Sequence, residues 1–452
     1  MSAVLQTWIL EKYEGLAPAG SLRARFAAGA FWSVAGAMIS RGFLLAASVV
    51  CAWFLGKEGF GALGMIQSTA GMFGVFAGLG LGITATKYVS ALRRQDPTRT
   101  GRILALSASV AFVSGSTITL LVVFLAPYLA RHVLAAPELA APLAIGAGLV
   151  FFGSINGAQT GALAGFEAFQ TIAKVNVFAG LASFPLIVYG VWRGGLRGAI
   201  LGSVATLAIQ WALNHYALRR ECAKANISYR FAGSHREAGM LYRFSLPAFL
   251  ASILVVAAIW VCNALLARQP QGYAELGLYA AADKWRVLIV FLPNYVFAMI
   301  VPVLSNLHGE GDGAGFQKVF KANLRLNAGL ALVLAVLITA FAGPIMAMYG
   351  SSFSAGRIVL VVLAFSACAE VLNSILGQPL IASHQMWRKF AFDLFLVVLL
   401  VGVAWALIPK WGARGLAASY VVAYALSGLT LFLFHLQSFY FGQHWQAAKV
   451  RT

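Results

Sequence analysis

Residues 26–54 read FAAGAFWSVAGAMISRGFLLAASVVCAWF, a run of 29 residues that carries a single charge, Arg41. A helix of about 20 apolar residues crosses the roughly 30 Å hydrocarbon core of a bilayer. Residues 26–54 are long enough to do so. The run is also continuously apolar rather than alternating, which favours a helix over a barrel strand. It therefore indicates a membrane-spanning helix.

The rest of the chain repeats this pattern. Hydrophobic residues make up 60% of the 452 and charged residues 10%, whereas soluble domains carry about 25% charged residues. We expect further spans at 60–85, 103–130, 141–165, 171–192, 196–218, 242–266, 276–304, 322–349, 356–380, 388–408 and 413–437. The sequence predicts an all-α polytopic membrane protein of about twelve transmembrane helices, and this architecture is typical of a transporter.

The net charge of +19 would suit nucleic-acid binding, but the distribution of the charge excludes that class. Lys and Arg lie in short loops between the apolar runs. If the N-terminus is cytosolic, 22 of them fall on the cytosolic side and 8 on the other. The positive-inside rule then places both termini in the cytosol.

The two halves of the sequence are related by an internal repeat. Residues 193–198 (RGGLRG) match 410–415 (KWGARG) at an offset of 217, and Asn156 matches Asn373 at the same offset. Six spans per half is an even number, so both halves enter the membrane in the same orientation. Parallel repeats of this kind are typical of transporters, whose substrate sites lie between the repeats.

The repeat sets the predicted domains. Gly61, at the head of the second span, also matches Gly277, at the head of the eighth, with an offset of 216. We expect a cytosolic N-terminal segment at 1–25 and a six-helix bundle at 26–218. A basic cytosolic linker at 219–241 leads to a second six-helix bundle at 242–437, and a cytosolic tail follows at 438–452.

Charged residues inside spans are costly and face a polar interior. Arg41 lies near the middle of the first span, where it could contact an anion in a cavity or pair with a neighbouring helix. Asp283 and Arg286 are three residues apart and can pair, while Lys284 points about 100° away from them. These residues form either a cationic rim on a cavity or a local ion pair with a snorkelling lysine.

Glu370 is the acidic candidate in the tenth span. It could pair structurally, with Arg41 for example, couple transport to an ion, or contact substrate. Asn156, Gln159 and Asn373 are polar residues that could line the cavity or hydrogen-bond between helices. Gly74, Gly78 and Gly82 are spaced four apart and predict a face for close helix packing.

Motifs for other functions are missing from the sequence. No Walker motif, HExxH pair or CxxC pair occurs, so neither direct ATP-driven pumping nor a metal site is indicated. We therefore expect no cofactor, no metal and no catalytic residues.

Two stretches carry a family resemblance. Residues 53–61 (WFLGKEGFG) end the first span, and residues 76–89 (FAGLGLGITATKYV) follow within and after the second. They resemble the N-terminal signature of bacterial polysaccharide-transport proteins, the O-antigen and oligosaccharide flippases. That family belongs to the multidrug/oligosaccharidyl-lipid/polysaccharide exporter superfamily. The resemblance is clearest over 26–105, and a basic residue in the first span, here Arg41, also fits the family.

The resemblance implies a V-shaped pair of six-helix bundles in the bacterial inner membrane that work by alternating access. The implied cargo is an oligosaccharide on undecaprenyl pyrophosphate, with membrane lipids and the polymerase and glycosyltransferases of the same pathway as partners. We expect Arg41, Lys284 and Arg286 to contact the diphosphate, because arginine binds phosphate bidentately. We expect Asn156, Gln159 and Asn373 to contact sugar hydroxyls. Proton or sodium coupling at Glu370 or Asp283 stays open.

Three other functions compete with this one. A drug/cation antiporter of the multidrug-extrusion type needs acidic residues in the lumen, and here Glu370 and Asp283 are outnumbered by cations. A lipid II flippase usually has fourteen spans, whereas twelve are expected here. A membrane glycan polymerase or ligase typically carries a large periplasmic loop, and the loops here are short. An excess of cations favours an anionic cargo.

Overall fold

The computed structural model describes residues 22–240, 245–383 and 385–449. In the first half these residues form α2 (Leu22–Gly78), α3 (Leu81–Leu92), α4 (Pro97–Tyr128), α5 (Ala140–Gly165) and α6 (Phe169–Lys224). In the second half they form α7 (Leu246–Ala267), α8 (Gly272–Gly309), α9 (Gly313–Ala340), α10 (Ala342–Ala347), α11 (Arg357–Ala382) and α12 (Met386–Lys449). The remaining turns are η1 (Leu129–Val133), η2 (Pro137–Leu139), η3 (Ser234–Glu237) and η5 (Ser351–Gly356). The described residues contain no strand, as expected where backbone groups must be satisfied without water.

Three of the helical segments are hairpins. In α2 the chain leaves helical geometry at Gly56, which has φ 63° and ψ −179°. Arg41 and Gly71, which lie 15 residues to either side of Gly56, line the same cavity, so the two arms of α2 run side by side. Glycine suits such a turn because it adopts positive φ without a Cβ penalty.

The other two hairpins turn at positions matched by the sequence repeat. Gly195 in α6 has φ 53° and ψ −134°, and Gly412 in α12 has φ 54° and ψ −129°. Phe392 and Phe434, on opposite sides of Gly412, have ring centroids 5.6 Å apart. The two halves of the chain therefore use the same backbone turn between their fifth and sixth passes.

These hairpins account for the number of membrane passes. Seven described segments are long and apolar enough to span a membrane, including α2, α6 and α12. Each of those three contributes two passes, and α7 and α8 add one each, which makes twelve. The all-α polytopic membrane fold predicted from the sequence is confirmed.

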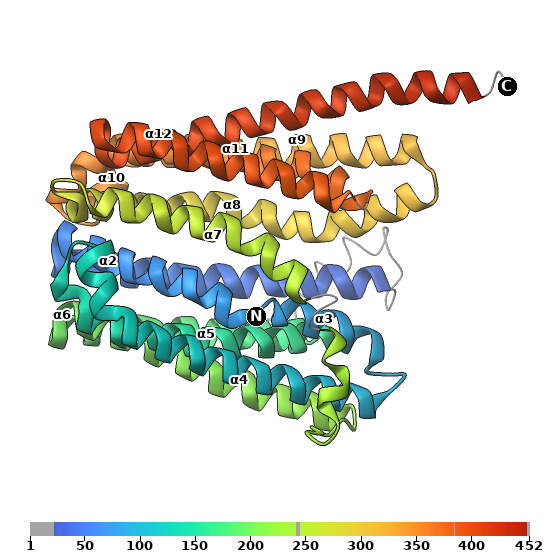
Figure 1. The fold of residues 1–452 in the computed structure, drawn as a ribbon, viewed down its shortest axis with the longest axis horizontal. Coiled ribbons are helices and arrows are strands. Elements are labelled where there is room, and N and C mark those ends of the chain that lie inside the picture. Colours follow the sequence, from blue (N-terminus) through green and yellow to red (C-terminus); the bar gives the residue numbers. More distant parts are fainter. Residues whose placement is uncertain (1–21, 241–244, 384, 450–452) are drawn as a thin grey trace, which may run out of the picture.

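The two groups of helices meet in a reciprocal contact between α2 and α8. Figure 1 shows α2–α6 as the lower group and α7–α12 as the upper one, with helices roughly parallel to the long axis. A Cβ on Gly61 would clash with the backbone of Tyr273, and a Cβ on Gly277 with the backbone of Lys57. Lys57 and Tyr273 are themselves 216 residues apart. Glycine at both repeat-related positions thus lets α2 and α8 approach closely in a reciprocal contact.

Further contacts between the groups gather at the end that carries the turns at Gly56, Gly195 and Gly412, which we call the turn end. Trp53 Nε1 donates to the Met348 carbonyl at 2.6 Å, and the Phe60 ring packs edge-on against Phe353 with centroids 5.9 Å apart. Towards the opposite end, which we call the basic end, α12 diverges from α4 and α6 in Figure 1, while Thr84 Oγ1 and Ser245 Oγ, 2.7 Å apart, still join α3 to the start of α7.

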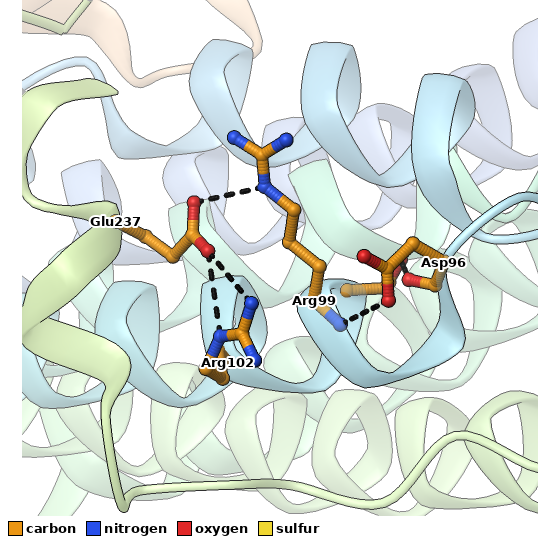
Figure 2. Close-up of polar contacts among 5 residues, drawn as sticks. Asp96, Arg99, Arg102 and Glu237 are labelled. Atoms are coloured by element: carbon orange, nitrogen blue, oxygen red, sulfur yellow. Dashed lines mark hydrogen bonds and ion pairs between the residues drawn. The ribbon is translucent and has the colours of Figure 1, made fainter.

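The linker between the halves is held on α4. Glu237 in η3 pairs with Arg99 at 3.0 Å and with Arg102 at 3.2 Å, and Asp96 caps α4 by accepting from the Arg99 backbone (Figure 2). A Cβ on Gly101 would clash with the Ser228 backbone, so the linker also lies close against the helix.

Several boundaries differ from the prediction. The span expected at 60–85 is broken at Leu79 and Gly80, whose φ angles are 45° and 67°, and α3 then starts a new direction. The helix expected to end at 437 continues to Lys449. Of the N-terminal segment predicted at 1–25, residues 1–21 lie outside the described part of the chain. The division into domains stays a prediction.

Candidate functional site

A cavity of about 940 Å³ lies among the helices α2, α5, α6 and α8, and both arms of α2 contribute to its wall. Arg41 lines it from the first arm of α2, and its guanidinium carbon lies 4.2 Å from the centroid of the Phe291 ring on α8. This stacking holds a charge at mid-membrane depth against an aromatic face, a favourable arrangement for arginine.

The second cation of the cavity is Lys284. Its Nζ donates to Gln67 Oε1 at 3.3 Å, which links α8 to the second arm of α2. Asp283 also lines the cavity, but its Oδ1 accepts from Arg286 Nε at 2.6 Å. Within the described residues, Arg41, Lys284 and Asp283 are the charged groups on the cavity wall, and the only acidic one is already paired.

Arg286 faces away from this cavity into the second group of helices. It pairs with both Asp283 on its own helix and Glu370 on α11, and its guanidinium carbon lies 5.1 Å from the Tyr420 ring centroid. Its side chain is 9% exposed, so desolvation makes the two carboxylates obligatory partners. The pairing of Asp283 with Arg286 follows the predicted geometry, while Glu370 pairs with Arg286 instead of the suggested Arg41.

Several glycines also line the cavity. Gly71, Gly74 and Gly153 line it, and a Cβ on any of them would point into open space. Packing therefore does not require glycine at these positions, and their effect is to widen the cavity. Of the predicted packing face, Gly82 does make a close contact, since its Cβ would lie 2.9 Å from the Gly157 carbonyl oxygen.

The three predicted amide contacts lie elsewhere. Asn156 donates to the Leu207 carbonyl at 2.9 Å and accepts from Asn214, and Asn373 accepts from Ser427 at 3.3 Å. Both asparagines thus join a helix to the sixth pass of its own half. Gln159 lines a second, smaller cavity rather than the central one. A role for these residues in sugar binding stays a prediction.

Gln67 and the cavity glycines were not predicted from the sequence. Gln67 stands as a lone amide in an apolar span, and the repeat offset of 216 aligns it with Asp283. Either observation could have singled it out. The glycines offered no comparable signal, because a glycine that widens a cavity and one that packs a helix look alike in a sequence.

Comparison with known proteins identifies the family. A model of the family described as "Polysaccharide biosynthesis protein" matches residues 26–308, which is more than half of the chain. The chain belongs to that family. The match runs from α2 to α8 and so includes the cavity residues Arg41, Gln67 and Lys284. The predicted relationship to polysaccharide-transport proteins is confirmed.

Relatives with curated names match most of the chain. The "EPS I polysaccharide export inner membrane protein EpsE" of Ralstonia nicotianae is 24% identical over 422 residues, covering 89% of this chain and 92% of that protein. "Stage V sporulation protein B" of Bacillus subtilis is 23% identical and covers 73% of this chain and 68% of that protein.

A solved structure supports the fold. The inward-facing conformation of a multidrug resistance MATE family transporter of the MOP superfamily superposes with a TM-score of 0.75 at 16% identity. It covers 90% of this chain and 97% of that one. The family member described here therefore has a MATE-like transporter fold.

Proposed function

We propose that this protein is a flippase of the bacterial inner membrane. Its cargo is an oligosaccharide on undecaprenyl pyrophosphate, carried from the cytosolic to the periplasmic leaflet by alternating access. The observation that carries the proposal is the charge of the central cavity. Arg41 and Lys284 face into it, whereas its one acidic wall residue in the described part of the chain is bound to Arg286. Such a wall attracts a diphosphate.

The shape of the cavity fits the rest of the cargo. About 940 Å³ is at the upper end of ordinary ligand pockets, which hold roughly 300–1,000 Å³. The half-buried amide residues Gln67 and Gln210 line it beside the open faces of the glycines, and they suit a polar glycan. The polyprenyl tail would stay in lipid between the two groups of helices.

The state and orientation of the protein follow from the same proposal. Phe60 lines the cavity and packs on Tyr349 and Phe353, so it closes the cavity towards the turn end. With the basic end and both termini in the cytosol, the cavity would load from the cytosol. The name of the Ralstonia relative supports the inner membrane as the location. Polymerase and glycosyltransferases of the same pathway are the expected partners.

A drug/cation antiporter is the main alternative, since the solved structure with the MATE fold is a multidrug transporter. A cationic drug would need a carboxylate that is available in the cavity. Asp283 already has a cationic partner in Arg286, and Lys284 is the next residue. The local charge therefore favours an anionic cargo. Coupling to protons or sodium stays a possible energy source.

The test is reconstitution in proteoliposomes that contain a fluorescent lipid-linked oligosaccharide in both leaflets. An impermeant quencher reports how much of the lipid reaches the outer leaflet. Wild-type protein is expected to flip the lipid faster than empty vesicles do. Arg41→Glu and Lys284→Glu should each lower the rate of flipping at least about tenfold, because each removes a charge-assisted hydrogen bond to the cargo.

Arg131→Glu is the matched control, because this arginine is exposed in η1 and does not line the cavity. Its rate should equal that of the wild type. Normal flipping by Arg41→Glu protein that is folded and inserted would contradict the proposal, as would equal losses in all three variants.

A further inference from the structure

A second cavity of about 240 Å³ opens between α4, α5 and the second arm of α6. Residues 229–231 of the linker cover one side of it, held there by the Arg230 backbone, which donates to the Gly101 carbonyl at 3.3 Å. Arg219 and His215 line it from α6. Among the described residues that line it none is acidic, so the wall is positive at its rim.

Two residues that line this cavity carry buried polar atoms without partners. Ser107 is 3% exposed and Gln159 9%, and within the described residues Ser107 Oγ and Gln159 Oε1 make no hydrogen bond. A buried polar group without a partner costs about 1–3 kcal/mol. A carbonyl oxygen accepts a hydrogen bond and a hydroxyl donates or accepts one, so ligand hydroxyl groups that reach these two atoms would satisfy both.

The positive charge at the rim is also accessible to a ligand. Arg219 is exposed, and within the described residues it makes no ion pair with an acidic side chain. Glu221, two residues on, is already paired with Lys224 at 2.7 Å. Burial raises the pKa of the Tyr229 phenol in the linker, so this wall residue stays protonated and adds a donor.

An aromatic track leads from the cavity along the helix surface. His215 stacks on Trp211, Trp211 lies 6.2 Å from Phe152, and Phe152 lies 5.2 Å from Phe151 between ring centroids. The track ends at Phe112 on α4, which packs against Phe151 and is 55% exposed. A surface of this kind suits acyl chains.

The depth of the cavity agrees with a lipid headgroup. Gln159 is six residues before the end of α5 at Gly165, or about 9 Å along the helix. Arg219 is five residues before the end of α6 at Lys224. The cavity therefore lies near the boundary between headgroups and hydrocarbon, and basic pockets between helices at this depth bind anionic lipids.

We propose that this cavity binds an anionic phospholipid with a polyol headgroup, such as phosphatidylglycerol. The phosphate accepts hydrogen bonds from Arg219, the headgroup hydroxyls reach Ser107 and Gln159, and an acyl chain lies along the aromatic track. The occupant is a lipid of the surrounding leaflet and differs from the transported cargo. About 240 Å³ equals roughly eight water molecules, which is too small for an oligosaccharide. The site does not depend on the proposed transport activity.

The test uses the full-length protein, delipidated in detergent and offered equimolar phosphatidylglycerol and phosphatidylcholine. Native mass spectrometry counts the lipids retained by each variant. The wild type should retain phosphatidylglycerol at least about tenfold better than phosphatidylcholine. Arg219→Gln and Gln159→Leu should each remove most of this preference, since charged and buried hydrogen bonds are lost.

Arg220→Gln is the matched control, because this neighbouring arginine is also exposed but does not line the cavity. It should keep the preference of the wild type. Gln159→Leu also removes an unpaired polar atom, so without lipid this variant should melt at a temperature no lower than the wild type. That readout shows that the loss of lipid is not a loss of folding.

Three results would overturn the proposal. Equal losses in Arg219→Gln and Arg220→Gln would mean general surface attraction. Equal retention of the two lipids by the wild type would mean no headgroup recognition. If glycerol 3-phosphate displaced the lipid at equal concentration, the cavity would be a site for a soluble anion to which the acyl chain contributes no affinity.

Discussion

Replacing Arg286 with methionine tests whether the ion cluster beside the cavity is structural. The substitution keeps an unbranched side chain and removes the cation between Asp283 and Glu370. Two carboxylates would then lie in a poorly solvated site without their partner. Breaking a buried ion pair in this way costs about 3–5 kcal/mol. We expect Arg286→Met to lower the free energy of unfolding by about this amount.

The triple variant Arg286→Met, Asp283→Asn and Glu370→Gln is the compensating partner. It removes the uncompensated charge, and its two amides keep the shapes of the acidic side chains, so it should recover most of the lost stability. Unfolding is followed by circular dichroism in mixed micelles with increasing dodecyl sulfate. The reasoning is refuted if the single variant is as stable as the wild type, or if the triple variant is no more stable than the single one.

Transport by the triple variant separates the roles considered for Glu370. A purely structural cluster predicts flipping at more than about half the wild-type rate once stability has recovered. If a stable triple variant no longer flips the lipid, at least one of Arg286, Asp283 and Glu370 takes part in ion coupling or substrate contact. The measurement therefore decides between alternatives that the sequence left open.

Other predictions concern the cavity wall, the linker and the hairpin turns. Gly74→Leu should block flipping, because the leucine side chain would enter the open cavity. Protein with Gly329→Leu, at an exposed position on α9, should flip the lipid normally in the same proteoliposomes. Glu237→Gln should release the linker from α4 and raise the rate of trypsin cleavage at Arg230 and Arg236 several-fold. An unchanged digestion pattern would argue against docking. Gly412→Ala should cost about 1–3 kcal/mol of unfolding free energy, because its φ of 54° with a ψ of −129° is a backbone conformation that residues with a Cβ rarely adopt. Gly402→Ala, within a regular stretch of the same α12, should change that free energy by less than about 1 kcal/mol. A loss at Gly412 no larger than that at Gly402 would contradict the role of the turn.

The fold was predictable because two simple signals agree along the chain. Apolar runs marked each pass, and the repeat of 193–198 at 410–415 placed equivalent turns that the structure shows with nearly identical backbone angles. The offset of 216 likewise matched Gly61 with Gly277, and the structure places these two glycines in a reciprocal contact between the halves.

The break at Leu79 and Gly80 was not predictable in the same way. Glycines at 78, 80 and 82 suit both a packed helix and a sharp turn, and hydropathy does not distinguish the two. The surrounding helices decide, since α3 packs against α5 through Gly82 and Gly161.

The buried charges were identified as a set, but their partners were not. Spacing predicted the pair of Asp283 with Arg286, because both lie on one helix. The contact from Arg286 to Glu370 joins residues 84 apart and depends on how α8 and α11 pack. This packing sets the rotation of α8 about its axis, and the rotation decides which cation faces the cavity. No local sequence pattern predicts that rotation.

Protection of a cysteine in the cavity tests the central claim most directly. Gly71→Cys, in a background without Cys51, Cys222, Cys262 and Cys368, places a thiol on the open cavity wall. Its rate of reaction with a water-soluble maleimide is measured in nanodiscs with and without the undecaprenyl-linked oligosaccharide. Gly313→Cys, at the exposed start of α9, is the control. We predict that the cargo slows labelling at Gly71→Cys several-fold, leaves Gly313→Cys unchanged, and loses its effect when Arg41→Glu is added. Equal labelling of Gly71→Cys with and without the cargo would contradict passage of the oligosaccharide through this cavity.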